Sequence, residues 1–128
     1  MKTVVICGSR RYKPEIRAFA KKLAAKGIVV FEPILNTNPK IRELENDLKN
    51  YAFMGLTWHQ IELIRKANVV FIYNRDGYMG NSSTLELGAA AALGKTIYAL
   101  EPDKEESCRS VLFDKVVGSS EELIKLLK

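Results

Sequence analysis

The feature that most constrains this chain is a regular alternation of short apolar runs with longer, more polar stretches. Each run is rich in Val, Ile, Phe or Tyr and is bounded by turn-forming residues, as strands are. The runs are 3–8 (TVVICG), 28–33 (IVVFEP), 68–74 (NVVFIYN), 95–102 (KTIYALEP) and the shorter 111–117 (VLFDKVV). Strands that alternate with helices form a parallel sheet covered on both faces. The sequence therefore predicts a single doubly wound α/β domain over residues 1–128, flavodoxin-like or Rossmann-like, with a five-stranded parallel sheet.

Capping signals place two of the helices. Pro14 suits the first turn of a helix that runs to about Lys26, and Gly27 ends that helix. Near the C-terminus, Ser119 and Glu122 have the S-x-x-E spacing of a capping box. We therefore expect a first helix that begins near Pro14 and a last helix that begins at Ser119.

The segment 34–67, between the second and third strands, is less regular. It predicts a polar loop at 36–40 (NTNPK), a charged helix near 40–52 and a second helix near 56–66. An excursion of this length often forms a lid or a subunit contact.

Charge and composition are only a weak indication of anionic partners, and a small anion such as a nucleotide would fit them as well as a nucleic acid would. The net charge is +5, but basic and acidic residues are mixed along the chain, which favours a solvated surface over a nucleic-acid groove. No apolar run approaches the ~20 residues of a membrane span, so no membrane partner is expected. His59 stands alone, and Cys7 and Cys108 lack metal-ligand spacing, so no metal is expected. Without a disulfide framework, the two cysteines fit a cytoplasmic protein.

A ligand site is expected at one edge of the sheet, because doubly wound domains bind ligands beyond the carboxyl ends of their strands. The segments that follow predicted strands there are 8–13 (GSRRYK), 74–83 (NRDGYMGNSS) and 101–107 (EPDKEES). In the first of them, the turn made by Gly8, Ser9, Arg10, Arg11 and Tyr12 offers helix N-terminal amides, a hydroxyl and two guanidiniums, which suit a phosphate. An ordinary glycine turn after a strand would have the same pattern.

The sequence supports two interpretations of Glu86 equally well. Ser83 and Glu86 have the S-x-x-E spacing, so Glu86 can simply close a capping box at a helix N-terminus. Alternatively, the Gly-, Asn- and Ser-rich loop at 77–83 lets the backbone approach a ligand, and the helix dipole keeps the carboxylate ionised. An ionised carboxylate at a sugar C1 is what nucleophilic glycoside cleavage requires.

Two stretches together resemble the nucleoside 2-deoxyribosyltransferase superfamily, which includes the 2′-deoxynucleoside 5′-monophosphate N-glycosidases. They are 3–12 (TVVICGSRRY) and 67–100 (ANVVFIYNRDGYMGNSSTLELGAAAALGKTIYAL). The shared pattern is an apolar strand, a Gly/Ser loop and then T-x-E-[LI]-G-x-A-x-A-L-G-K, found here at 84–95. The resemblance covers strand one with its turn and most of 59–117, and it is specific for the superfamily rather than for one activity.

The resemblance implies roles for several residues. Glu86 would be the nucleophile that attacks the anomeric carbon of deoxyribose and expels the base, with no cofactor. The turn Gly8–Arg10 would lie beside the sugar and its 5′ end, and its CGS-x-R form is more similar to the monophosphate glycosidases than to the free-nucleoside transferases. Ser82 or Ser83 would contact the phosphate. The substrate would thus be a nucleoside or nucleotide.

The resemblance also implies a homo-oligomer, dimeric or larger, because the relatives assemble so that a neighbour completes the pocket. The candidate interface residues are Tyr51, Phe53, Met54 and Trp58.

The chain departs from the family pattern at two positions. The catalysts place an aspartate about eight residues before strand three, to protonate the departing base or hold the sugar, whereas this chain has Gln60 there. Gln60 can hydrogen-bond a base but cannot give up a proton. His59 beside it could be the acid, since a histidine pKa can lie near 7, or it could be an ordinary surface residue. The transferases also carry an acidic residue where this chain has Gly80.

Other loop residues are weaker candidates. Tyr12 and Tyr78 can stack on a base or pack against the sugar, or they can be ordinary loop aromatics. Asn74 and Asn81 can bond hydroxyls or stabilise turns. The remaining candidates in the loops after strands three and four are Gly77, Asp103 and Ser107.

Two functions remain after this comparison. The first is cleavage or transfer at the N-glycosidic bond of a 2′-deoxynucleoside or its 5′-monophosphate, and the second is a non-catalytic nucleotide-binding module on the same fold. A receiver or flavodoxin role is disfavoured, because no acidic cluster follows strand one and the Ser/Thr-Gly-rich flavodoxin loop is missing. A phosphoribohydrolase of the cytokinin-activating kind is a distant alternative, since the loop at 77–86 (GYMGNSSTLE) only partly matches its glycine-rich motif.

Overall fold

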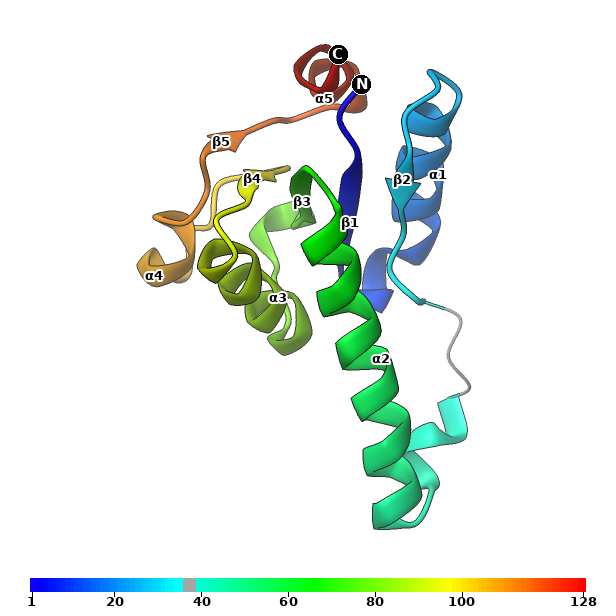
Figure 1. Cartoon of the computed structure of the whole chain (residues 1–128). Helices are drawn as coiled ribbons and strands as arrows, with labels where there is room; N and C mark the ends of the chain where they lie inside the picture. Colours follow the sequence, from blue (N-terminus) through cyan, green and yellow to red (C-terminus); the bar gives the residue numbers. More distant parts are fainter. Residues whose placement is uncertain (36–38) are drawn as a thin grey trace.

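Five parallel strands form one sheet in the order β2-β1-β3-β4-β5, with helices on both faces (Figure 1). The computed structural model describes residues 1–35 and 39–128. The strands are β1 (Val4–Gly8), β2 (Val30–Phe31), β3 (Val69–Tyr73), β4 (Thr96–Ala99) and β5 (Lys115–Val116). The α-helices are α1 (Lys13–Ala24), α2 (Asn46–Lys66), α3 (Asn81–Ala92), α4 (Ser107–Ser110) and α5 (Ser120–Leu127). Three 3₁₀ helices are η1 (Arg10–Tyr12), η2 (Pro39–Glu43) and η3 (Arg75–Gly77). The predicted α/β fold with a five-stranded parallel sheet is thus confirmed.

Strand residues alternate between two apolar cores, one on each side of the sheet. On β1, Val4 and Ile6 belong to the core shared with α1 and α5, whereas Val5 and Cys7 belong to the core shared with α2 and α3. This alternation is the two-residue period of a strand, and with both faces covered every residue of β3 is buried. The central strands therefore hold the loops at their carboxyl ends on a rigid support.

The capping signals at the two ends of the chain are confirmed. The Ser119 hydroxyl accepts a hydrogen bond from the Glu122 amide at 3.2 Å and caps α5. Pro14 lies in the first turn of α1, and Gly27 follows its end with a φ of 81°, which a residue with a side chain rarely adopts.

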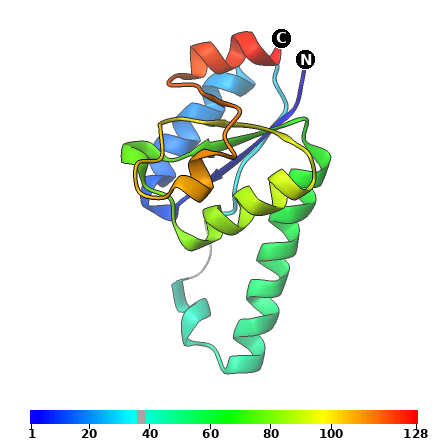
Figure 2. The same cartoon turned by 90° about the vertical axis from the view of Figure 1, so that its left-hand side faces the viewer.

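The prediction of two helices in the segment 34–67 was wrong. A single helix of 21 residues, α2, covers most of it, preceded by η2. No proline interrupts α2, and Gly55 alone costs only about 1 kcal/mol relative to Ala, which is too little to break a helix that packs on the sheet. Its C-terminal half buries Gln60 and Ile64, and its N-terminal half runs past the edge of the sheet (Figures 1 and 2). The loop predicted at 36–40 lies mainly outside the described residues.

The two edge strands are shorter than the predicted runs. β2 and β5 contain two residues each and pair with one neighbour each, so fewer backbone hydrogen bonds hold them than hold β1 or β3. Val111 ends α4 instead of beginning a strand. Within the described residues, none of the helices is both long and apolar enough to cross a membrane.

Candidate functional site

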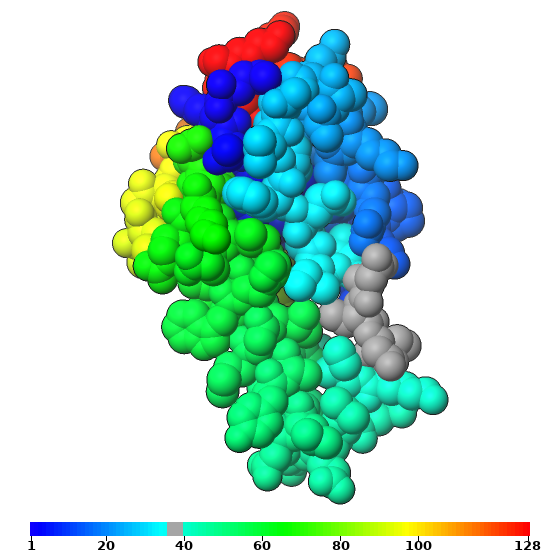
Figure 3. Space-filling model, turned by 45° about the vertical axis from the view of Figure 1, so that its right-hand side comes forward, coloured from blue at the N-terminus to red at the C-terminus, as the bar shows by residue number. Residues whose placement is uncertain are grey.

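A cavity of about 470 Å³ lies beyond the carboxyl ends of β1 and β3. This is the point where the strand order reverses, since β2 continues the sheet on one side of β1 and β3 on the other. Four segments enclose the cavity: the turn after β1, the loop after β2, the middle of α2 with η2, and the start of α3 with the loop before it. In Figure 3, α2 (green) extends below the rest of the fold, beside the residues that follow β2 (cyan). The site therefore draws on parts of the chain that are distant in sequence.

Glu86 lies in this cavity and does not cap α3. The helix begins at Asn81, with Gly80 as its N-cap, so Ser83 is the third helical residue and Glu86 the sixth. The Thr84 amide and hydroxyl both bond the Gly80 carbonyl, at 3.0 and 2.9 Å, which sets the start of the helix three residues earlier than the capping box requires. The capping-box interpretation of Glu86 was therefore wrong.

Burial controls the charge of Glu86. The side chain is half-buried and forms no hydrogen bond or ion pair with any described residue. Burial raises its pKa from an ordinary 4.5 to about 7, because a carboxylate loses hydration in this position without gaining a partner. The expectation that the helix dipole keeps this carboxylate ionised is thus corrected: Glu86 lies in the second turn, and loss of hydration dominates.

Gln60 lines the cavity from α2 with its amide fixed against β1. Its Nε2 donates to the Ile6 carbonyl at 3.2 Å and to the Cys7 sulfur at 3.5 Å. Both N–H groups are thereby occupied, so Oε1 is the hydrogen-bonding atom of Gln60 that remains for a ligand. Burial, followed by the nearby Glu86 charge, raises the pKa of Cys7 well above its usual value, and the bond from Gln60 lowers it. Cys7 and Gln60 are buried, and the half-buried Glu86 lies near enough to influence the charge of Cys7.

His59 and Tyr12 are not brought into the cavity. His59 is exposed on α2 and is absent from the residues that line the cavity, although Gln60 beside it is among them. Tyr12 packs on Tyr73, with ring centroids 6.3 Å apart, and on the edge of Tyr78. Tyr78 itself lines the cavity.

The predicted turn after β1 and the loop before α3 meet in the cavity. Gly8, Ser9 and Arg10 line one side, with the Ser9 hydroxyl accepting a hydrogen bond from the Arg11 amide at 3.1 Å. On the other side, the residues from Gly80 through the first turn of α3, which are Asn81, Ser82 and Ser83, also line the cavity. Gly80 is extended and supplies no side-chain cap, so the first amides of α3 are available to an anion.

Asn74 and Gly77 support the site without lining it. The fully buried Asn74 donates to the Glu101 carbonyl at 2.8 Å and accepts from the Glu101 amide at 3.0 Å, joining the ends of β3 and β4. Gly77 has a φ of 76° in the turn after β3.

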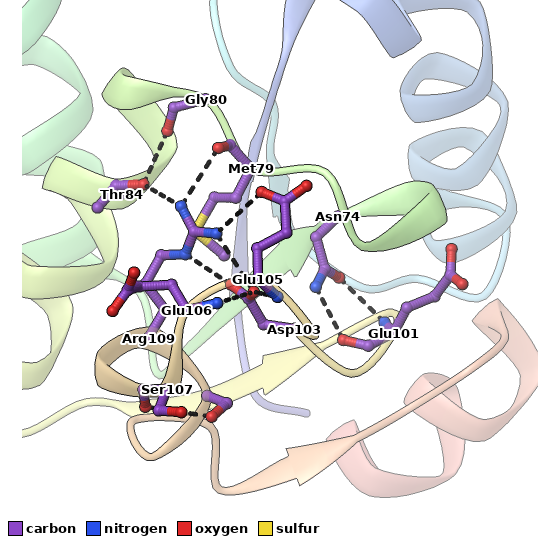
Figure 4. Close-up of polar contacts among 11 residues, drawn as sticks. Asn74, Met79, Gly80, Thr84, Glu101, Asp103, Glu105, Glu106, Ser107 and Arg109 are labelled. Atoms are coloured by element: carbon purple, nitrogen blue, oxygen red, sulfur yellow. Dashed lines mark hydrogen bonds and ion pairs between the residues drawn. The ribbon is translucent and has the colours of Figure 1, made fainter.

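The segment 101–107 supports the loop before α3 instead of lining the cavity. Asp103 accepts hydrogen bonds from the amides of Glu105 and Glu106 and from Arg109 (Figure 4). Arg109 in turn reaches the Met79 carbonyl at 3.5 Å and the Thr84 hydroxyl at 3.3 Å. None of the residues 101–107 is among those that line the cavity, and Asp103 instead anchors Arg109 behind the loop.

Several lining residues were missed by the sequence analysis. They are Pro33, Ile34, Leu35, Arg42, Phe53, Leu56, Thr57 and Leu85. The loop after β2 follows a parallel strand beside β1, so the same rule that selected the other loops should have included it. Phe53 was expected at an interface, but it is half-buried, lines the cavity and has the Arg42 guanidinium 5.0 Å from its ring centroid.

Within the described residues, no group of three or more His, Cys, Asp or Glu side chains could hold a metal ion. The polar groups of the cavity instead suit an organic anion: guanidiniums of Arg10 and Arg42, hydroxyls, and the amides at the start of α3.

Comparison by sequence finds neither a matching family model nor a similar curated protein. Solved structures do share the fold. A 2-deoxyribosyltransferase from Bacillus psychrosaccharolyticus superposes with a TM-score of 0.70 at 16% identity, over 95% of this chain and 90% of that one. A conserved protein from Enterococcus faecalis gives 0.63 at 16% identity, over 98% and 96% of the two chains. The CMP N-glycosidase BcmB of Clostridium botulinum gives 0.56 at 15% identity, over 98% and 97%. The chain thus shares the fold of a 2-deoxyribosyltransferase and of a CMP N-glycosidase.

Proposed function

We propose that this protein cleaves or transfers the N-glycosidic bond of a 2′-deoxynucleoside or its 5′-monophosphate, with Glu86 as the nucleophile. The observation that carries the proposal is the position of Glu86. It is the one carboxylate among the described residues that line the cavity, and it has no structural partner. A side chain that caps nothing and pairs with nothing is free to react.

The cavity has a polar part and an apolar part that fit the two ends of a nucleotide. The turn Gly8–Arg10 and the start of α3 would hold the sugar and its 5′ end. The apolar side chains that would hold the base are Ile34, Leu35, Phe53, Leu56 and Leu85. Small-molecule sites typically combine such apolar side chains with polar groups that converge on the ligand.

The reaction would proceed by double displacement. The Glu86 carboxylate forms a bond to C1′ while the C1′–N bond breaks, and the bonding electron pair leaves with the base, which takes a proton from water. Water then attacks C1′ and loses a proton to solvent, and the bond between C1′ and Glu86 breaks. A second base in place of water would complete a transfer instead of a hydrolysis.

No side chain of the described lining is assigned as the acid for the departing base. Gln60 has no proton to give at neutral pH, and its amide hydrogens are bonded to β1. His59 is exposed outside the lining, so the proposal does not use it. Gln60 would accept a hydrogen bond from an N–H of the base through Oε1.

The second candidate is a non-catalytic nucleotide-binding module. Gln60 is the observation that favours it, because a neutral amide occupies the position where the catalysts of this superfamily usually carry an acid. In this case the same cavity would bind a nucleotide without turnover.

The test is chromatography of the protein incubated with each deoxynucleoside and each deoxynucleoside monophosphate, with and without a second base. Glu86→Gln is compared with Glu62→Gln, a matched change at an exposed residue of α2. Free base released by the wild type and by Glu62→Gln, but not by a folded Glu86→Gln, supports cleavage, and base exchange supports transfer. No product together with a ligand-dependent rise in melting temperature supports the binding module. Wild-type rates in Glu86→Gln would exclude the proposed nucleophile.

A further inference from the structure

Tyr78 links the two loops that form the polar side of the cavity. It ends η3, two residues before the N-cap of α3, and it lines the cavity. The Arg11 guanidinium lies over its ring, with Cζ 3.6 Å from the ring centroid, and Tyr12 meets the ring nearly edge-on at a centroid distance of 6.2 Å. The guanidinium of Arg11, a residue of η1, therefore covers one face of the Tyr78 ring. The sequence analysis considered that Tyr78 could stack on a base, and at most the other face of the ring is available for that.

The hydroxyl of Tyr78 lies at the start of α3. A Cβ atom added to Gly80 would lie 3.3 Å from Tyr78 Oη, which places this oxygen beside the N-cap residue. Tyr78 Oη forms no hydrogen bond with any described residue. A phenol that projects toward the first turn of a helix, and lines a cavity there, has its O–H free for a ligand.

The groups around this hydroxyl suit an anion. Asn81, Ser82 and Ser83, at the start of α3, line the cavity together with Tyr78, and Gly80 provides no side chain that would satisfy the first amides of this helix. Arg11 brings a positive charge to the Tyr78 ring, and Arg10 brings another to the cavity wall. The Tyr78 hydroxyl adds a hydrogen-bond donor without adding a negative charge that would repel an anion.

We propose that Tyr78 is a specificity-determining residue that donates a hydrogen bond from its hydroxyl to the 5′-phosphate of the substrate. The site then selects deoxynucleoside 5′-monophosphates over free deoxynucleosides. Arg11 is a positioning residue, which holds the Tyr78 ring by a cation–π contact so that the hydroxyl stays beside Gly80. This inference rests on the proposed function for the identity of the ligand, but it concerns binding and not the cleavage step.

The experiment measures dissociation constants for the four common 2′-deoxynucleosides and their 5′-monophosphates by titration calorimetry. The readout is the preference, the ratio of the two constants for each base. Tyr78→Phe keeps the ring that contacts Arg11 and Tyr12 and removes only the hydroxyl. We expect the preference for the monophosphate to fall roughly tenfold, the usual effect of one hydrogen bond to a charged group. Tyr98→Phe removes a hydroxyl from β4, outside the cavity lining, and should leave the preference unchanged.

Arg11 is tested by partial rescue. Arg11→Leu should lower the same preference, and Arg11→Lys should restore part of it, because an ammonium can also lie over an aromatic ring. A purely structural role for Arg11 would lower the melting temperature in both variants without changing the preference.

The outcomes separate this inference from the cleavage chemistry. Equal binding of the two ligand forms by the wild type, no binding of either, or an undiminished preference in Tyr78→Phe would each overturn the inference. A preference that depends on Tyr78, in a protein that releases no base, would support the inference and exclude cleavage. Base release without any preference for monophosphates would support cleavage and overturn the inference.

Discussion

Arg109 and Asp103 form an ion pair with an Nε–Oδ2 distance of 2.6 Å, in which the Asp103 side chain is fully buried. Burial by itself disfavours the ionised Asp103, but hydrogen bonds from Arg109 and from the amides of Glu106 and Glu105 outweigh it and hold the pKa of Asp103 below its usual value. Because Arg109 also bonds Met79 and Thr84, this pair fixes the loop from which Tyr78 and Gly80 reach the cavity.

Arg109→Ala should destabilise the protein by about 3 kcal/mol at pH 7, because it leaves a buried carboxylate without its partner. Urea unfolding measures this loss. Arg65→Ala is the control, since Arg65 pairs with Glu62 at 3.3 Å with both side chains more than half exposed, and it should cost less than about 1 kcal/mol. The folded pKa of Asp103 is lowered, so its stabilisation is present above the unfolded value of 3.8 and is lost as the pH falls through the folded pKa. Equal losses in the two variants would contradict this account.

Glu86→Gln should make the protein more stable at alkaline pH. The folded pKa of Glu86 is raised from 4.5 to about 7, so the folded state binds the proton more tightly than the unfolded state. The contribution of Glu86 to stability is therefore fully present below pH 4.5 and is lost as the pH rises through about 7. Glu86→Gln removes this decline, and unfolding in urea at pH 8 should show a gain on the order of 2 kcal/mol that is absent at low pH. A gain of the same size at both pH values would show that packing, not charge, is responsible.

The proposed activity should increase with pH through neutrality. Only the ionised Glu86 can attack C1′, and its pKa is about 7. We expect kcat/KM to rise about tenfold per pH unit on the acid side and to level off above the pKa. Initial rates of base release between pH 5 and 9 measure this profile. A profile that is flat between pH 5 and 8 would mean that the essential carboxylate is not Glu86.

Gln60→Glu should destabilise the protein by about 1–3 kcal/mol at pH 8 and by less at pH 5. The amide of Gln60 donates to the Ile6 carbonyl. An ionised carboxylate in its place has no proton to donate, so its oxygen would repel the carbonyl oxygen. At pH 5 the introduced carboxyl group can hold a proton and donate this bond again. Thermal unfolding at the two pH values measures the effect, and a pH-independent loss would argue against the donor role of Gln60.

We predict that the exposed apolar stripe of α2 mediates self-association. The stripe consists of Leu48, Tyr51, Met54 and Trp58, spaced three or four residues apart and each more than half exposed. Trp58→Lys should shift the molar mass in light scattering from an oligomer to a monomer. Val111→Lys, which changes an exposed apolar residue that is not part of the stripe, should leave the mass unchanged. A wild-type monomer would contradict the prediction.

The sequence alone determined the parallel sheet and the edge where the cavity lies. Apolar runs such as 68–74 can be recognised as strands because every side chain of β3 is buried between two helical layers. The start of α5 was also predictable, since its cap joins Ser119 and Glu122, three residues apart. The apolar character of a strand and the cap of a helix depend on residues that are close together in the sequence, so the sequence pattern alone is enough to predict them.

Only the tertiary structure decided what Glu86 does. The S-x-x-E spacing at Ser83 is as good as the one at Ser119, but α3 begins three residues earlier, where Arg109 from another part of the chain also bonds Thr84. The pKa of Glu86 also depends on the tertiary structure, because burial raises it. The orientation of the Gln60 amide depends on its hydrogen bond to the Ile6 carbonyl, 54 residues away in the sequence. Hydration loss and long-range hydrogen bonds are properties of packed elements, and no local spacing of residues encodes them.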